Sequence, residues 1–227
     1  MKRKAFLAAL PHTLPICVGF LFVGTGYGLL LKSEGFPLIY PLLQAFIIFA
    51  GSMQFVTVGL LLAPFNPIYA FFLTVMVNAR HLFYGVSLLD KYRHTGWMKP
   101  YLIYGLIDES FSLNCAVSAP EGVDQNWFMF FITLLNHIYW ICGSCLGNIL
   151  GNIIRFDTTG IDFVMTALFV VLFINQWKET GDHRPALVGL GCTVLSLLLF
   201  GSEHFMLPAM AVIVLFFLLQ MRKEAKA

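Results

Sequence analysis

Residues Asn66 to Leu89 read NPIYAFFLTVMVNARHLFYGVSLL, an apolar run with Asn78, Arg80 and His81 near its middle. A hydrocarbon core about 30 Å thick takes roughly 20 residues of helix to cross, so this stretch is long enough to span a bilayer with its polar residues at mid-depth. An arginine there costs at least ~2.5 kcal/mol and normally faces a carboxylate, a carbonyl or a water-filled cavity. The stretch therefore indicates a transport or permeation site, with a structural ion pair between two helices as the alternative.

The composition of the whole chain predicts an all-α, polytopic integral membrane protein. Of its 227 residues, 59% are hydrophobic and 11% are charged, and the mean hydropathy is +0.80, whereas soluble domains carry about 25% charged residues. At roughly 20 residues for a full span, the chain can form a bundle of about seven or eight transmembrane or half-membrane helices. We expect one transmembrane transporter domain over residues 1–227. With a net charge of only +2, membrane lipid is the expected surrounding and nucleic acid is not.

Eight hydrophobic stretches can be drawn, and they lie near 11–31, 37–62, 66–89, 100–119, 127–151, 161–177, 186–202 and 205–220. Positively charged loops tend to face the cytoplasm, and such charges occur at Lys2–Lys4, Lys91–Lys99 and Arg222–Lys226. Glu121 and Asp124 suit the outside. Three stretches then separate the first two cytoplasmic segments, and five separate the last two. An odd number of complete spans would place the two ends on opposite sides of the membrane, so complete spans alone cannot explain this charge pattern.

One broken or re-entrant element in each half of the chain would remove this parity conflict between the number of stretches and the positions of the charges. Transporters often carry such elements at the substrate site. In the first half the candidate is 37–62, interrupted at Ala50-Gly51-Ser52, and in the second half it lies around Gly201-Ser202-Glu203-His204. The alternative is that the charge rule fails at one terminus, and both explanations remain open at the level of the sequence.

Helix geometry separates the polar residues of the stretch 66–89. Asn78 and His81 are three positions apart and share a face, whereas Arg80 points to nearly the opposite side at 3.6 residues per turn. A regular helix therefore cannot aim Asn78 and Arg80 into one cavity. Either polar groups surround the helix on both sides, or the helix is distorted here, and both options place it inside the protein.

Two adjacent carboxylates, Asp108 and Glu109, lie in the next hydrophobic stretch. Neighbouring carboxylates in a low dielectric resist ionising together, so one of them can load and release a proton. Membrane carboxylates often form proton relays, which makes Asp108 and Glu109 candidates for proton coupling, with one of them a counter-ion for Arg80. The alternative is that both merely neutralise positive charge.

Two further groups of polar residues have weaker signals. Ser52 and Gln54, beside Gly51, offer hydroxyl and amide groups that suit the ammonium and carboxylate of an amino acid at a broken helix. Asn136 and His137 are better explained by hydrogen bonds between helices.

Small residues form stripes that predict close helix packing. Gly24 and Gly28 make one G-x-x-x-G pattern, and Gly143, Gly147 and Gly151 make a double one. Such surfaces let backbones approach closely in lipid. The packing can be within the subunit or against a partner.

Four segments together resemble the AzlC family (AzlC/YgaZ type), the large membrane subunit of bacterial branched-chain amino acid exporters. They are AGSMQF at 50–55, NARHLFYG at 78–85, DESF at 108–111 and IDFVMTALF at 161–169. Their order, the chain length and the hydrophobic profile match nearly end to end, although Ile161 stands where the family usually has leucine. The resemblance implies a multi-pass exporter of valine, leucine and isoleucine in the bacterial inner membrane, with methionine as a further candidate. It also implies a small AzlD-type membrane partner in a hetero-oligomer, and a secondary carrier driven by an ion gradient.

The family motifs, carried onto this sequence, point to a set of site residues: Gly51, Ser52, Gln54, Asn78, Arg80, His81, Asp108, Glu109 and Asp162. We expect Arg80 or the N-terminus of a half-helix to bind the substrate carboxylate. Asp108 or Glu109 is expected to carry the coupling proton.

Other functions are also compatible with the composition. The chain has no G-x-x-x-x-G-K-[ST] loop, so an ATP-driven transporter would need another chain to hydrolyse ATP, with this chain as its permease subunit. Transport of another small zwitterion is a further alternative. An enzyme is disfavoured because the H-E-x-x-H and G-x-S-x-G motifs are missing, and we expect no catalytic residue, metal site or cofactor.

Overall fold

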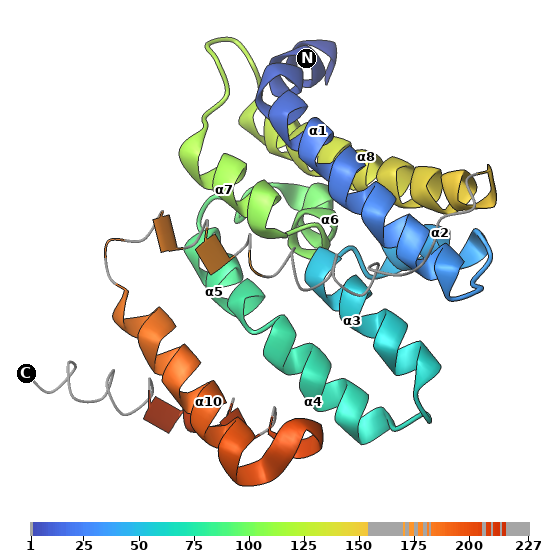
Figure 1. Cartoon of the computed structure of the whole chain (residues 1–227). Helices are drawn as coiled ribbons and strands as arrows, with labels where there is room; N and C mark the ends of the chain where they lie inside the picture. The colour runs from blue at the N-terminus through green and yellow to red at the C-terminus, as the bar shows by residue number, and fades with distance from the viewer. Residues whose placement is uncertain are drawn as a thin grey trace, which may run out of the picture. The chain divides into compact units, whose positions relative to one another are not determined.

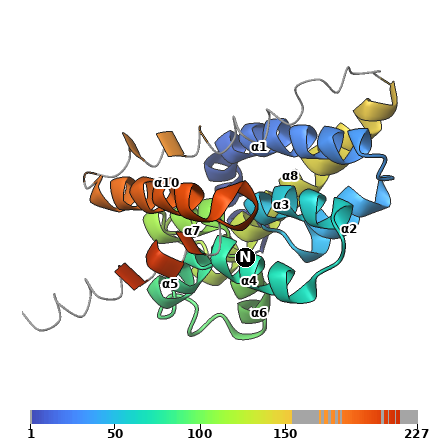
Figure 2. The same cartoon turned by 60° about the horizontal axis from the view of Figure 1, so that its bottom comes forward.

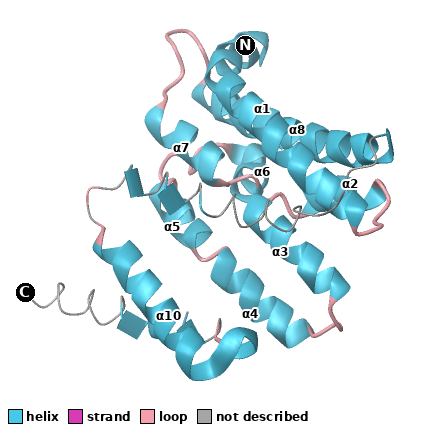
Figure 3. Cartoon of the chain, in the orientation of Figure 1, coloured by secondary structure: helices cyan, strands magenta, loops and turns pink. Residues whose placement is uncertain are grey.

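The computed structural model describes residues 2–153, 170, 173–174, 177–178, 181, 183–205, 208–209, 211–213 and 215–216. Regular structure in the described residues is helical throughout (Figure 3), which confirms the all-α prediction. Internal contacts divide the chain into two compact units, residues 1–161 and 162–227, and each is described on its own. The single domain over 1–227 stays a prediction.

Two long helices frame the first unit: α1 (Lys2–Ser33) and α8 (Gln125–Ile153). Both are long and apolar enough to cross a membrane. They lie side by side (Figures 1 and 2) and run in the same direction, because Phe6 packs on Phe131 and, further along both helices, Phe20 packs on Trp140, each pair with ring centroids 5.4 Å apart. We call the end with their N-termini end A and the opposite end B.

Glycines on the shared face allow α1 and α8 to approach closely. A Cβ atom at Gly28 would collide with the carbonyl oxygen of Ser144 and lie 2.9 Å from the Cα of Gly147. Backbone contact of this kind gains dispersion energy that lipid cannot replace. The stripes predicted from sequence therefore pack within the subunit.

We expect Gly28→Ala to destabilise this helix pair by about 1–3 kcal/mol, the usual cost of overpacking, because the added methyl group meets the backbone of α8. Gly19→Ala in the same helix is the matched control, since no described atom would lie within 4 Å of its methyl group. Thermal unfolding of both variants in detergent measures the difference. Equal melting temperatures would contradict the close packing.

The first helical hairpin consists of α2 (Ile39–Ile47) and α3 (Gly51–Leu62). It enters from end B, because α2 runs against α8. Asn148 near end B donates a 3.1 Å hydrogen bond to the carbonyl of Phe36, just before α2. Closer to the middle of α8, a ring nitrogen of His137 lies 3.1 Å from the carbonyl oxygen of Ala45.

The turn of the first hairpin covers residues 48–50 and so overlaps the interruption predicted at Ala50-Gly51-Ser52. Within it Phe49 has a φ of +43°, a strained conformation for a residue other than glycine. From there α3 starts beside Trp140 and leads back toward end B (Figure 1), with the Phe55 ring centroid 5.3 Å from that of Tyr27. The stretch 37–62 is therefore a re-entrant hairpin.

The stretch 66–89 forms two helices where the sequence suggested one: α4 (Pro67–Val77) and α5 (Arg80–Ser87). Asn66 caps the first of them by accepting a 3.0 Å hydrogen bond from the amide of Tyr69, a side-chain cap typical of helix starts. The break after Val77 is the distortion that the opposite directions of Asn78 and Arg80 predicted as one option. Together α4 and α5 lead from end B toward end A (Figure 1).

A second hairpin enters from end A and comprises a short 3-10 helix and two α-helices: η1 (Gly96–Met98), α6 (Lys99–Tyr104) and α7 (Asp108–Ala116). Its first limb follows α8 inward, from Trp97 at 5.8 Å from Trp127 to Tyr104 at 5.7 Å from His137, between ring centroids. Its second limb returns toward end A, because Leu113 of α7 packs against a buried cluster that includes Ala9 and Phe128, near the starts of α1 and α8.

The sequence did not predict this second re-entrant element at 100–119. Its tip contains Gly105, where a Cβ atom would collide with Cγ2 of Thr133, so the close approach requires glycine. A single glycine in an apolar stretch is a weak signal for a break. With the hairpin at 37–62, the parity conflict in the first half disappears, because the N-terminus and the loop after α5 share end A.

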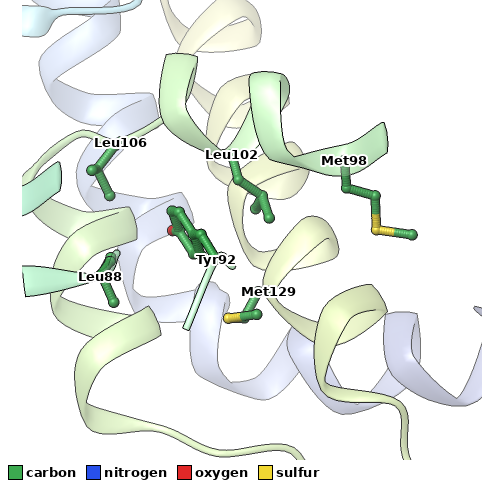
Figure 4. Close-up of a cluster of buried hydrophobic side chains, with 6 residues drawn as sticks. All are labelled: Leu88, Tyr92, Met98, Leu102, Leu106 and Met129. Atoms are coloured by element: carbon green, nitrogen blue, oxygen red, sulfur yellow. The ribbon is translucent and has the colours of Figure 1, made fainter. Parts of the chain in front are cut away.

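A cluster of buried side chains packs the first limb of the second hairpin against α8 and the segment after α5 (Figure 4). Its members are Leu88, Tyr92, Met98, Leu102, Leu106 and Met129. Each is at most 5% exposed, so the hairpin is held from Met98 near its base to Leu106 at its tip.

The ends of the first unit correct one topological prediction. Lys2 lies 4.5 Å above the Trp127 ring, and the carbonyl of His94 accepts a hydrogen bond from the start of α8. The N-terminus and the loop after α5 thus share end A, as the charges predict. Asp124 lies there too, so the prediction that Glu121 and Asp124 are on the opposite side is wrong. Asp124 caps α8 instead, and acidic residues contribute little to topology.

In the second unit, the structure describes α10 (Arg184–His204). Gly201 has a φ of +72° inside it, which breaks the helix where the sequence predicted an interruption. Residues 184–201 are long and apolar enough to cross a membrane. The stretches 161–177 and 205–220 lie mostly outside the described residues.

Candidate functional site

Three helices of the first unit begin at breaks inside it, and each starts with a residue predicted for the site. Ser52 is the second residue of α3, Arg80 is the first of α5 and Asp108 is the first of α7. The two hairpin tips and the break between α4 and α5 therefore bring these residues together from three elements distant in sequence.

Arg80 joins the other two side chains. Its Nη1 lies 2.9 Å from Oδ2 of Asp108, and its Nη2 donates a 3.0 Å hydrogen bond to Oγ of Ser52. The planar guanidinium fork thus holds one residue from each hairpin, a geometry that the single ammonium group of lysine cannot reproduce. The predicted ion pair of Arg80 with one of the two acids is present, and Asp108 is the partner.

Tyr84 is a member of the site that the sequence analysis did not select. Its hydroxyl donates a 2.8 Å hydrogen bond to Oδ1 of Asp108, so both carboxylate oxygens have partners. Its ring stacks on Phe111, with the centroids 4.2 Å apart. The sequence does contain a signal for including Tyr84 in the site, because Tyr84 is four residues after Arg80 and lies on the same helix face.

The electrostatics of the site favour an anion that can reach it. The positive ends of three helix dipoles add to the charge of Arg80. Asp108 and Glu109 occupy the first turn of α7, where negative charge is favourable, and Asp108 offsets the unfavourable position of Arg80 at the start of α5. Because the side chains of Arg80 and Asp108 are 41% and 36% exposed, a solute can compete for their contacts.

Three other predicted residues lie next to this cluster. Asn78 ends α4, with its amide 3.1 Å from the carbonyl oxygen of Thr74, and its buried Oδ1 has no hydrogen-bond partner among the described residues. The His81 ring stands edge-on to Tyr84, with the centroids 5.6 Å apart. Glu109 follows Asp108 in α7 and is partly exposed.

Gln54 and Gly51 belong to a different environment. Gln54 is fully buried, and its Oε1 accepts a 2.7 Å hydrogen bond from Nε1 of Trp140. It is two positions from Ser52 and so points away from Arg80. Gly51 packs beside the same tryptophan. The structure therefore does not bring Gln54 to the charged cluster, and Asp162 lies outside the described residues.

The cluster around Arg80 can interact with a ligand through ionic and polar contacts. In the described part of the chain, no three His, Cys, Asp or Glu side chains gather in a way that could hold a metal ion. The arrangement offers charge-assisted hydrogen bonds to a carboxylate and a carboxyl group that can exchange a proton.

Comparison with known proteins gives a family match over most of the first unit. The family described as "AzlC protein" matches residues 15–154. The "Branched-chain amino acid transport protein AzlC" of Bacillus subtilis (strain 168) is 57% identical over 209 residues, which is 92% of this chain and 82% of that protein. An "Uncharacterized membrane protein" of Haemophilus influenzae is 44% identical over 91% of this chain and 85% of its own length. The "Inner membrane protein YgaZ" of Escherichia coli (strain K12) is 28% identical over 85% of this chain and 83% of its own length. No solved structure matches.

Proposed function

The chain belongs to the AzlC family, and on that premise we propose that it is a secondary transporter subunit exporting branched-chain amino acids across the bacterial inner membrane. Its substrates are valine, leucine and isoleucine, with methionine as a further candidate. The relative from Bacillus subtilis, named as a branched-chain amino acid transport protein, supports this substrate class.

The observation that carries the proposal is the position of Arg80 between the tips of two re-entrant hairpins. In this structure its guanidinium is paired with Asp108 and Ser52. A substrate carboxylate presents the same two oxygen acceptors as Asp108, so it can replace that side chain on the guanidinium fork. The dipoles of the converging half-helices add to the attraction, as in transporters with broken helices at the substrate site.

The same pair supports coupling to a proton gradient. When Asp108 is ionised, a zwitterionic substrate can place its carboxylate on Arg80 and its ammonium group on Asp108. When Asp108 takes up a proton it loses the charge that attracts the ammonium group, so the proton and the substrate compete for the site. Inward movement of a proton can then drive outward movement of the substrate. Glu109, the next residue, is the second candidate for carrying the proton, and the Tyr84 hydroxyl holds Asp108 in place throughout.

The proposed assembly includes a small membrane partner of the AzlD type. The resemblance to the AzlC family supports this partner, and so transport is expected to require both chains or to be faster with both. The proposed location is the inner membrane, in line with the name of the Escherichia coli relative.

The test is efflux of labelled leucine from preloaded liposomes that contain the chain with its partner and no ATP. We expect faster efflux when the outside is acidified, and loss of this stimulation when a protonophore collapses the gradient. Liposomes with this chain alone measure the contribution of the partner. Efflux that starts only on addition of ATP and an ATPase subunit would favour the ATP-driven alternative, and transport confined to other zwitterions would overturn the substrate assignment.

A further inference from the structure

We infer that His137 is a positioning residue, which holds the tips of both re-entrant hairpins and so sets Ser52 and Asp108 at the distance that Arg80 bridges. This inference rests on the proposed function for its consequence in transport. His137 lies on α8 and is buried, at 5% exposed, so it acts from behind the site.

One ring nitrogen of His137 serves the first hairpin. A helix that ends inside a membrane leaves carbonyl groups without partners, and these need donors from elsewhere in the protein. Nε2 of His137 lies 3.1 Å from the carbonyl oxygen of Ala45, in the last turn of α2. The next carbonyl, that of Phe46, accepts a hydrogen bond from the Tyr104 hydroxyl. The end of α2 is therefore capped by α8 and by the second hairpin.

The ring of His137 also supports the strained turn. Phe49, with its φ of +43°, stacks on this ring with the centroids 4.3 Å apart. Phe46 stacks on it as well, at 5.8 Å. Surrounding structure must stabilise a backbone conformation of this kind, and His137 supplies both a hydrogen bond and a stacking surface next to it.

The other ring nitrogen serves the second hairpin. Nδ1 of His137 lies 3.0 Å from the Tyr101 hydroxyl. Because the Ala45 carbonyl can only accept, Nε2 carries the hydrogen, and Nδ1 of the neutral ring accepts from Tyr101. The Tyr104 ring packs edge-on to the same imidazole, with the centroids 5.7 Å apart. One imidazole thus contacts both hairpins with different atoms.

These contacts lie a few residues before the side chains that Arg80 bridges. Gly51 starts α3 two residues after Phe49, and Asp108 starts α7 four residues after Tyr104. A shift of either hairpin tip therefore changes the distance between Ser52 and Asp108. His137 fixes this distance from α8, the long helix along which both hairpins pack.

The experiment compares His137→Phe with His137→Gln. Phenylalanine keeps a stacking ring and loses both hydrogen bonds, whereas the amide nitrogen of glutamine can replace Nε2 as the donor to Ala45. In the liposome assay we expect His137→Phe to raise KM for leucine about tenfold, because the two lost hydrogen bonds leave both hairpin tips less well positioned for substrate binding. His137→Gln should recover most of the affinity. His94→Gln, at an exposed loop position, is the control.

A second experiment measures the distance between the two hairpin tips and does not depend on transport. Spin labels are placed at Ile47 and Ile103, which are 62% and 53% exposed, after replacement of the five native cysteines. We expect a narrow distance distribution with His137 or Gln at this position and a broadened one with Phe. Unchanged distances and unchanged KM in His137→Phe, or equal broadening in both variants, would overturn the inference. Broadening in His137→Phe alone, in a chain that does not transport leucine, would support the positioning of the hairpins and overturn only the proposed function.

Discussion

Replacement of Arg80 by alanine is expected to abolish gradient-driven leucine efflux and to weaken substrate binding about 10- to 100-fold. The physical reason is that hydrogen bonds to charged groups contribute about 1.5–3 kcal/mol each, and Arg80 is the cation at the meeting point of the two hairpin tips. The change also leaves Asp108 without its ion-pair partner. Initial efflux rates and leucine-dependent thermal stabilisation measure the two effects.

Arg80→Lys is the sharper comparison. Lysine keeps the positive charge but not the planar fork, so it cannot hold Ser52 and Asp108 through two separate nitrogens. We expect this variant to bind leucine more weakly than the native chain and more tightly than Arg80→Ala. Native leucine affinity in Arg80→Ala, in protein that is folded and in the membrane, would show that the substrate carboxylate binds elsewhere.

Replacement of Asp108 by asparagine is expected to separate binding from coupling. Asparagine keeps the shape and can still accept the hydrogen bond from Tyr84, but it cannot load and release a proton. Arg80 then stays available to the substrate carboxylate at every pH. We expect exchange of internal for external leucine to persist, while stimulation of net efflux by an imposed pH gradient is lost.

Two variants control this result. Asp124→Asn changes another acidic residue, at the cap of α8 at end A, and should leave coupling intact because asparagine is an equally good cap. Glu109→Gln tests the neighbouring carboxylate, and loss of coupling there alone would assign the proton to Glu109. If both Asp108→Asn and Glu109→Gln keep gradient-driven efflux and its pH dependence, neither residue is the coupling group.

Much of the site could be anticipated from the sequence because intramembrane charge is costly. An arginine and two acids inside apolar stretches have few arrangements other than mutual pairing, and the ion pair between Arg80 and Asp108 has that form. The distortion at Asn78 was one of the two options that local geometry left open, since a regular helix cannot aim positions 78 and 80 in one direction.

Residues with weak local signals were assigned less well. Gln54 resembles Ser52 in type and neighbourhood, yet it turns toward Trp140 because neighbouring helical positions face different elements. Tyr84 was passed over because tyrosine is common in apolar stretches, and its role depends on where α7 begins. Glu121 and Asp124 were placed on the wrong side because their charge was interpreted without the direction of α8.

The sequence by itself determined that this is an all-α membrane protein of the AzlC family with an intramembrane arginine and carboxylates, because composition, hydrophobic length and motif order are properties of the chain. The tertiary structure alone decided that 37–62 and 100–119 are re-entrant hairpins from opposite ends, that α1 and α8 run parallel, and that His137 contacts both tips. The physical reason is that an apolar stretch has the same hydropathy whether it crosses the membrane or turns back within it. Only packing against α8 shows which way each half-helix runs.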